Sequence, residues 1–363
     1  MILRTIMAEL EDVELTWFHL RKPEAGWPRS VYLGEPLIGA PILRDLLITP
    51  RIWLAGHHPA IEGWAKQILA ARADVHWVVG MNEGFWVGNA LRRLAPKIPL
   101  HVSIHDDQEQ GMFRRMHRYW WMARMVCRPV RQLLKNADGV DVISDGMQDY
   151  YQRQFGVKSI VIRPFIARLP AVSSPAQDSN TVTIGHIGSL YDCVPFLKFL
   201  KAAKCWSFML KRQLRVVLIG LSRPLIKRIK AYNESITVVD HPNLPESEAV
   251  QHLARCDFVY AMYPFARNAR VFRTTSFPTK LSTYVQSQRP IFAHTPEPST
   301  LAAFIKDTGL GVIASEMDVN TLQAKIGQIM QLNIEQRYYE AARERFYGTW
   351  NIARMHTCLT TRQ

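Results

Sequence analysis

The chain has 363 residues, 48% of them hydrophobic and 21% charged, which excludes a disordered, collagen-like or coiled-coil protein. This length favours two domains, each large enough to bury a hydrophobic core of its own. The 45 Lys and Arg against 31 Asp and Glu give a net charge of +14, so we expect an anionic partner: a polyanion, a membrane surface or a phosphorylated substrate.

The first half alternates β-type runs with helical stretches, a rhythm that predicts a mostly parallel sheet. The expected strands are 13–18, 75–79, 100–104, 140–143 and 159–162. The expected helices are 61–72, 86–94 and 113–135, after a first helix at 5–10. A stretch rich in Pro, Ser and Asp then begins at residue 168 and lacks periodicity, which is typical of a linker.

The same rhythm restarts after the linker. The expected strands are 182–187, 216–219, 236–239, 258–261, 291–293 and 311–313, and the expected helices are 195–210, 224–232, 246–254, 279–287, 299–306 and an amphipathic run at 335–352. We therefore predict an α/β protein with two Rossmann-like, doubly wound domains. Its parts are an N-terminal domain at 1–167, a linker at 168–181, a second domain at 182–334 and a C-terminal helix at 335–363 that crosses back to the first domain.

Ligands of open α/β sheets bind beyond the carboxyl ends of the strands, so we examined the residues where strands give way to helices. Ser276, Thr279 and Lys280 stand at a helix start, where free N–H groups and a lysine favour a phosphate; the alternative is a surface lysine beside an ordinary cap. Gly188 and Ser189 close the first strand of the second half. They indicate a glycine-lined cleft and are a weak signal for a dinucleotide cofactor.

His105, Asp106 and Asp107 end a strand of the first half. A carboxylate beside a like charge or in a dry cleft is readily tuned into a general base. The alternative is an aspartate that caps the next helix, with His105 packed nearby.

The expected helix at 113–135 interleaves arginines, Arg118 and Arg124 among them, with the pair Trp120 and Trp121. Basic and aromatic residues on one helix favour docking on an anionic membrane surface. The alternative is an ordinary amphipathic helix with a buried aromatic stripe.

The five cysteines are scattered and no Cys/His set has zinc spacing, so we predict no metal and no disulfide framework, in a reducing cytoplasm. No apolar run approaches the roughly 20 residues that span a bilayer. The N-terminus does not resemble a secretion signal.

Three segments of the second half, 182–190, 256–264 and 277–284, resemble the donor-binding half of GT-B glycosyltransferases of the glycosyl transferase 4-like and xanthan glucuronosyltransferase types. In the first half, 104–107 and 142–147 are also similar to that family. The resemblance implies two Rossmann-like domains facing a cleft. It also implies a nucleotide-sugar co-substrate, UDP- or GDP-linked, bound by the second domain without a metal, with the acceptor bound by the first.

The resemblance also implies roles for single residues. Lys280 is similar to the lysine that contacts the donor diphosphate, and Thr283 stands where relatives place a ribose-contacting Glu or Gln. Asp106, with Asp107 as second choice, stands where relatives have an aspartate base. The other residues expected to bind the donor are Gly188, Ser189, Tyr263, Arg273, Ser276, Thr279 and Tyr284.

The sequence departs from the family pattern in three respects. No Arg and Lys pair follows Gly188 in the loop, where Arg267, Arg270 and Arg273 are the candidates to replace it. The paired glutamates of many retaining members would fall at Thr275 and Thr283, so both are missing. The chain also starts at what would be the family's first helix, without the preceding strand and glycine loop.

From these features we expect a glycosyltransferase of cell-envelope polysaccharide biosynthesis. It would act on a polysaccharide or lipid-linked acceptor at the inner face of the cell membrane as a peripheral protein, with no nucleic-acid partner. One alternative is a degenerate GT-B subunit or carbohydrate-binding partner without catalysis, motivated by the two threonines. Another is a basic nucleic-acid-binding protein, which the charge favours but no recognised motif accompanies.

Overall fold

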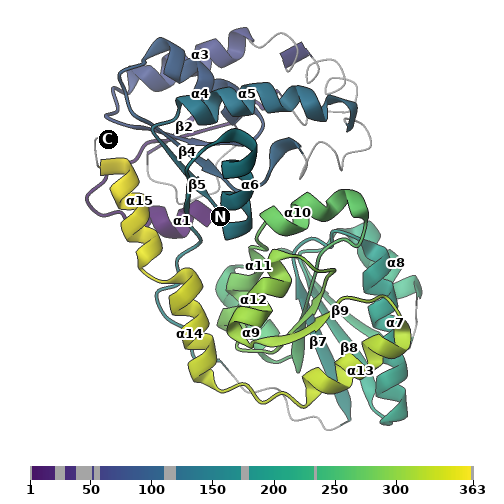
Figure 1. The fold of residues 1–363 in the computed structure, drawn as a ribbon. Coiled ribbons are helices and arrows are strands. Elements are labelled where there is room, and N and C mark those ends of the chain that lie inside the picture. The colour runs from purple at the N-terminus through teal and green to yellow at the C-terminus, as the bar shows by residue number, and fades with distance from the viewer. Residues whose placement is uncertain are drawn as a thin grey trace. The chain divides into compact units, whose positions relative to one another are not determined.

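The computed structural model describes residues 2–20, 29–37, 51–52, 58–109, 120–172, 180–232 and 235–360. It divides into two compact units, and Figure 1 labels many of their elements. Unit 1 comprises Met1–Arg163, Thr274–Ser276 and Trp350–Gln363, and unit 2 comprises Pro164–Arg273 and Phe277–Thr349. The chain therefore contributes three separate segments to unit 1.

Unit 1 contains a four-stranded parallel sheet in the order β3-β4-β5-β6 and a parallel pair, β1-β2. The strands are β1 Trp17–His19, β2 Ser30–Tyr32, β3 His76–Val79, β4 Leu100–Ile104, β5 Gly139–Val142 and β6 Ile160–Val161. The helices are α1 Ile2–Met7, α3 Pro59–Ala70, α4 Glu83–Leu94, η3 Trp120–Met122, α5 Ala123–Asn136, α6 Asp145–Phe155 and α15 Trp350–Thr360.

Strand β4 has the predicted bounds: its β-branched and apolar residues Leu100, Val102 and Ile104 alternate with His101 and Ser103, and all five are buried. Helix α6 was not predicted, since most of its residues are polar. Its buried residues Met147, Tyr151 and Phe155 recur every four positions and form one stripe. The helix is set at both ends by its caps: the Ser144 hydroxyl accepts from the N–H of Met147, and Gly156 takes the left-handed conformation.

Unit 2 contains a six-stranded parallel sheet in the order β12-β11-β10-β7-β8-β9. The strands are β7 Thr181–Ile187, β8 Gln213–Ile219, β9 Thr237–His241, β10 Phe258–Met262, β11 Ile291–His294 and β12 Gly311–Ala314. The strand order runs outward from β7 in one direction and from β10 in the other. This reversal confirms the doubly wound α/β fold predicted for the second half.

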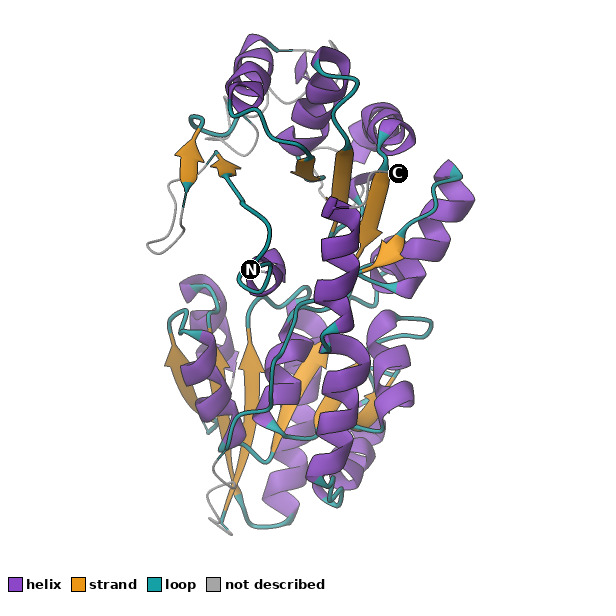
Figure 2. Cartoon of the chain, turned by 90° about the vertical axis from the view of Figure 1, so that its left-hand side faces the viewer, coloured by secondary structure: helices purple, strands orange, loops and turns teal. Residues whose placement is uncertain are grey.

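Helices cover both faces of this sheet, as Figure 2 shows. Helices α7 Cys193–Met209, α8 Arg223–Tyr232 and α13 Val319–Met330 pack together on one face. The helices on the other face are α9 Glu246–Ala254, α11 Lys280–Ser287 and α12 Thr300–Thr308. Helix α14 Gln336–Tyr347 packs against α11 and α12. Between sheet and helices, Phe199 lies 4.4 Å from Tyr260 and 4.8 Å from Phe292, centroid to centroid.

Helix α9 has the predicted bounds. The helical run expected at 335–352 is instead two helices, α14 and α15, because the extended backbone of Gly348 interrupts it. Helix α14 belongs to unit 2 and α15 to unit 1. Helices α13 and α10 Arg270–Thr275, with η4 Arg267–Ala269 before α10, lie in segments for which no element was predicted.

Candidate functional site

The sheet of unit 2 has a topological switch point between β7 and β10, which are neighbours in the sheet. The chain leaves these two strands in opposite directions, and in open α/β sheets the resulting crevice at their carboxyl ends is where ligands bind. Gly188 follows β7 with a φ of +76°, a conformation that favours glycine. Tyr263 follows β10. The predicted residues Gly188, Ser189 and Tyr263 thus stand at the switch point.

Lys280 is the first residue of α11, and its side chain reaches the loop that follows β7. Its Nζ donates to the backbone carbonyl of Ser189 at 2.8 Å and lies 5.4 Å from the ring of Tyr191. Lys280 is only 9% exposed, and burial lowers the pKa of its ammonium group from 10.5 to about 7. Ser189 itself is exposed. A cation therefore lies just beneath the surface of the switch point.

No carboxylate in the described part of the chain forms an ion pair with Lys280, and its hydrogen bond goes to a neutral carbonyl. A buried charge that has only a neutral partner is unfavourable, so the site is arranged to gain from an anion. The N–H groups of Leu281 and Ser282 donate to the carbonyls of Pro278 and Thr279. We therefore assign the preference for an anion to Lys280 more than to the end of α11.

An aromatic cluster of Tyr191, Tyr263 and Phe272 lies beside Lys280. The ring of Tyr191 is 5.8 Å from that of Tyr263 and 5.1 Å from that of Phe272. Tyr263 is fully buried and its hydroxyl forms a hydrogen bond with the Thr300 hydroxyl at 3.1 Å. Tyr191 therefore packs against a fixed, buried ring. Tyr191 is the half-buried member and was not predicted; its place just past the glycine turn is the signal that could have identified it.

Tyr284 joins α11 to the end of β7. Its hydroxyl donates to the carbonyl of Tyr260 at 2.8 Å and accepts from the N–H of Ile187 at 3.3 Å. Tyr284 is completely buried, and burial raises the pKa of its phenol well above the usual range. Tyr284, which was predicted to bind the donor, therefore holds β7 and β10 together and does not line the crevice between them.

Thr283 and Thr279 have different surroundings. The Thr283 hydroxyl donates to Oε1 of Glu246 at 3.4 Å, and the same oxygen accepts from Gln286 at 2.8 Å. Glu246 begins α9 and is exposed, so a carboxylate lies beside the position where the family glutamate is missing. Sequence spacing could not find it. Thr279 is exposed and its side chain does not cap α11.

Arg273 is 6% exposed and holds the loop after β10. Its Nη1 donates to the carbonyls of Pro264 at 3.1 Å and Ala266 at 2.9 Å, while its Nε has no hydrogen-bond partner in the described part of the chain. Burial, with the nearby Arg270, lowers the pKa of this guanidinium. Arg273 thus shapes the loop beside Tyr263.

The carboxylates predicted as a base follow β4 in unit 1 and differ in environment. Asp107 is 2% exposed and accepts from the hydroxyl of the buried Tyr151 at 3.2 Å. Asp106 is half-buried and accepts from the hydroxyl of Ser276 at 3.2 Å. Ser276, predicted to bind the donor, belongs to unit 1 by its contacts. Asp106 is therefore the more accessible carboxylate, and Asp107 is a buried hydrogen-bond acceptor within unit 1.

Two other residues complete the surroundings of this pair. Burial lowers the pKa of the His105 imidazole, and its Nε2 has no hydrogen-bond partner among the described residues. The hydroxyl of Ser144, which was not predicted, donates to the carbonyl of Thr275 and so holds the segment that carries Ser276.

The predicted membrane-docking residues are described only in part. Trp120 is 64% and Trp121 47% exposed, as docking requires. Arg118 lies outside the described residues, and the side chain of Arg124 is not described. Further along α5, Val130 and Leu133 are buried while Arg128 is exposed, so the helix is amphipathic.

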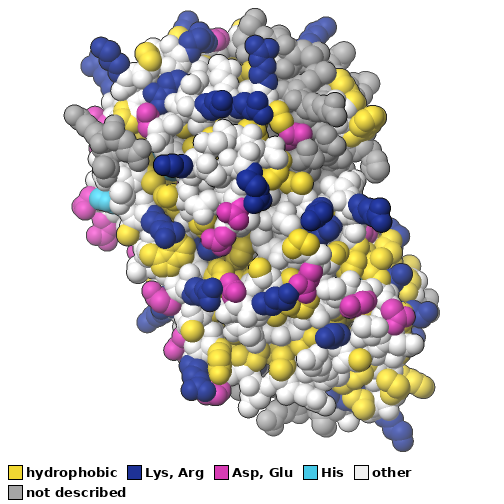
Figure 3. All heavy atoms as spheres, viewed as in Figure 1, with side chains coloured by type: hydrophobic (Ala, Val, Ile, Leu, Met, Phe, Trp, Pro, Cys, Tyr) yellow, Lys and Arg dark blue, Asp and Glu magenta, His cyan; other side chains and the backbone are white. Residues whose placement is uncertain are grey.

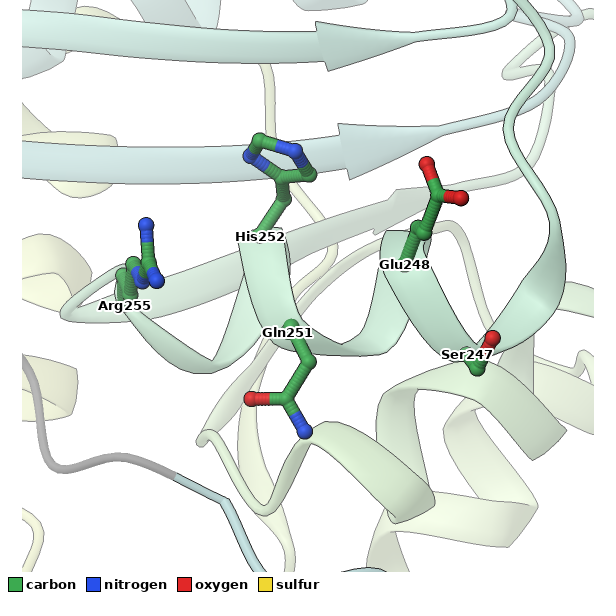
Figure 4. Close-up of a pocket in the computed structure, with 5 residues that line it drawn as sticks. All are labelled: Ser247, Glu248, Gln251, His252 and Arg255. Atoms are coloured by element: carbon green, nitrogen blue, oxygen red, sulfur yellow. The ribbon is translucent and has the colours of Figure 1, made fainter.

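A pocket of about 260 Å³ lies on α9. Figure 4 shows its lining residues, all from this helix and its C-cap: Ser247, Glu248, Gln251, His252 and the C-cap residue Arg255. The His252 ring lies 4.2 Å from that of His241 on β9, and burial is the main cause that lowers the pKa of His252. Because polar groups from several elements do not converge there, we place the candidate site at the switch point.

Within the described ranges, no three His, Cys, Asp or Glu side chains are grouped to hold a metal ion. None of the described helices has the length and apolar character required to cross a bilayer.

Comparison with known families places the first part of the chain. Residues 7–165 match the glycosyl transferase 4-like domain family. None of the curated proteins matches the chain significantly in sequence.

Solved structures cover nearly the whole chain. The α,α-trehalose 6-phosphate synthase of Burkholderia multivorans has a TM-score of 0.62 over 98% of this chain and 93% of its own, at 12% identity. HepE of Anabaena, solved with UDP and glucose, has a TM-score of 0.59 over 90% and 84%, at 13% identity. The lipopolysaccharide outer core galactosyltransferase WaaB has a TM-score of 0.57 over 91% and 84%, at 11% identity.

The two-unit α/β architecture is thus that of the GT-B glycosyltransferases. At these identities the structural likeness concerns the fold, and the family match supplies the link to sugar transfer. The resemblance predicted from sequence is confirmed at this level: residues 7–165 match a glycosyl transferase 4-like domain, and the fold of the chain is similar to that of GT-B glycosyltransferases.

Proposed function

We propose that this protein transfers a sugar from a nucleotide-sugar donor, UDP- or GDP-linked, to a polysaccharide or lipid-linked saccharide acceptor in cell-envelope polysaccharide synthesis. Unit 2 binds the donor and unit 1 the acceptor. The observation that carries the proposal is Lys280, a buried cation at the switch point whose hydrogen-bond partner is a neutral carbonyl. A diphosphate supplies the missing negative charge.

The proposed reaction is a displacement at the anomeric carbon. The acceptor oxygen forms a bond to that carbon while the bond from carbon to the diphosphate oxygen breaks. Asp106 takes the proton of the acceptor hydroxyl, for which its partial exposure suits it. Lys280 stabilises the negative charge that develops on the leaving diphosphate, so the proposal requires no metal.

The nucleoside part of the donor is proposed to meet the aromatic cluster and the carboxylate beside Thr283. Tyr191 is the half-buried ring next to Lys280. Glu246 has an exposed carboxylate held by Gln286 and Thr283, which is the kind of acceptor that sugar hydroxyls use. HepE, of similar fold, was solved with UDP and glucose, which supports a uridine nucleotide as the first ligand to test.

The protein is also proposed to act at the inner face of the cell membrane, where lipid-linked acceptors are found. The exposed Trp120 and Trp121, next to the arginine-rich α5, support a contact between unit 1 and lipid headgroups.

A thermal-shift titration with UDP, GDP, ADP, CMP and dTDP tests the donor site, because a ligand of the folded state raises the melting temperature by mass action. We expect one nucleoside diphosphate to stabilise the wild type, and Lys280→Met to remove the shift measured against its own ligand-free value. Lys306→Met is the matched control, since Lys306 is an exposed lysine of α12.

The outcomes separate the readings. A shift that survives in Lys280→Met would place the anion elsewhere. No shift with any nucleotide, from a folded wild type, would favour a non-catalytic GT-B subunit. Sugar transfer that needs Asp106 as well as a bound nucleotide would establish the enzyme.

A further inference from the structure

Three large apolar side chains stand in solvent where α7 ends. Phe208 is 79%, Met209 63% and Leu210 50% exposed, and we call these three residues the α7 tip. Such side chains usually lie in the core, and three consecutive exposed ones are unusual for a surface that faces only water. The α7 tip is independent of the donor site and of Trp120 and Trp121.

The α7 tip belongs to a well-formed turn. The N–H of Leu210 donates to the carbonyl of Ser207 at 3.2 Å, and the N–H of Arg212 donates to the same carbonyl at 2.9 Å. Lys211 has a φ of +54°, so a lysine occupies a left-handed position that normally favours glycine. The exposure therefore comes from an ordered helix end.

The surroundings of the α7 tip are cationic. From residue 193 to 232 the sequence has ten Lys and Arg and no Asp or Glu. Lys201, Lys211 and Arg215 are exposed close to the α7 tip in sequence. Figure 3 shows hydrophobic side chains together with Lys and Arg at the lower right, over the end of α7.

The α7 tip and Lys280 lie at opposite ends of the strands of the unit 2 sheet. Thr181 and Gln213 pair at the start of β7 and β8, and the turn carrying the α7 tip leads directly into Gln213. Lys280 contacts the loop beyond the other end of β7. Changes at the α7 tip can therefore be made without touching the donor site.

We propose that the α7 tip docks on an anionic lipid bilayer. Its apolar side chains enter the boundary between headgroups and acyl chains, and the surrounding cations meet the lipid phosphates. The charge selects this occupant, because the segment 193–232 that carries the α7 tip has ten Lys and Arg and no acid and so is complementary to a sheet of anionic headgroups. A symmetric dimer through the α7 tip would instead set the same cations against each other.

Vesicle co-flotation of the full chain tests this proposal. The probes are phosphatidylcholine vesicles with and without phosphatidylglycerol, and the variant is Phe208→Ser/Met209→Ser/Leu210→Ser. We expect the wild type to float only with the anionic vesicles, less so as salt rises, and the variant to lose about tenfold in partitioning. Lys211→Gln should give a smaller loss.

Two controls make the result specific. Tyr338→Ser removes a 47%-exposed side chain from α14 and should leave flotation unchanged. The circular dichroism and melting temperature of the triple variant should match the wild type, because exposed side chains contribute little to stability.

The proposal is overturned if the wild type ignores anionic vesicles, if the triple variant floats as well as the wild type, or if Tyr338→Ser loses as much. It is also overturned if light scattering shows an oligomer that the triple variant abolishes while vesicle binding persists. The α7 tip would then be a contact between copies of this chain.

Discussion

Replacing Lys280 with methionine is expected to stabilise the ligand-free protein while abolishing its binding of nucleoside diphosphates. Methionine keeps most of the buried stem and removes the charge. Burial lowers the pKa of Lys280 from 10.5 to about 7. Since each pH unit of that difference is worth about 1.4 kcal/mol, a protonated Lys280 costs the fold about 4 kcal/mol near pH 7. The variant also loses the hydrogen bond to Ser189, which costs it about 1 kcal/mol of stability. The net gain in the free energy of unfolding is therefore about 3 kcal/mol.

The effect has a definite pH dependence. Between pH 7 and 10.5 the unfolded lysine is protonated and the folded one is largely neutral, so unfolding takes up a proton. The wild type therefore gains stability as pH rises through this range, and the methionine variant lacks this contribution. The difference between the two proteins is largest at and below pH 7 and shrinks towards pH 10.5.

Urea unfolding followed by circular dichroism, at several pH values from 6 to about 9.5, measures both quantities. Lys306→Met, at an exposed lysine, should change the free energy of unfolding by less than about 0.5 kcal/mol. A wild type more stable than Lys280→Met at pH 7, or a difference that does not shrink with rising pH, would refute the account of Lys280 as a buried cation awaiting an anion.

Four further outcomes follow from the same structure. Nucleotide affinity, measured by calorimetry, should fall above pH 7 by up to about tenfold per pH unit, because the diphosphate selects the protonated Lys280. Asp106→Asn should lower the transfer rate at least about 100-fold in a radiolabelled-sugar assay and leave the nucleotide-induced thermal shift intact. Tyr284→Phe should cost about 1–3 kcal/mol in urea unfolding, because the Ile187 N–H and the Tyr260 carbonyl lose their buried partner. Trp120→Ser/Trp121→Ser should reduce vesicle binding, and a simultaneous loss of the nucleotide shift would point to misfolding instead.

Much of the fold was predictable because buried parallel strands leave a plain signal. Strand β10 is buried at every residue and is an unbroken apolar run, and β4, also fully buried, places an apolar residue at every second position. Helix α6 was missed because only Met147, Tyr151 and Phe155 are buried in it, and most of its other residues are polar. The break at Gly348 was missed because amphipathic spacing continues on both sides of it.

The candidate site was predictable in its residues and only partly in its contacts. Lys280 was identified as a helix-start lysine, but its bond to Ser189 joins positions 91 apart in the chain. Asp106 and Asp107 are adjacent in sequence, and the buried Tyr151 that separates their roles lies on another element. Glu246 reaches Thr283 only through the packing of α9 against α11.

Helix α15 gives the chain an order of completion during synthesis. It packs against α1, and its buried Asn351 accepts from the N–H of Arg163 at 2.7 Å, so segments that precede and follow unit 2 in the sequence together complete unit 1. A ribosome makes α1 before unit 2 and α15 after the whole of unit 2. Unit 2 is therefore able to fold before α15 has been made, whereas unit 1 keeps an unfinished edge until α15 is added. Chaperones should therefore bind nascent chains mainly at the incomplete unit 1.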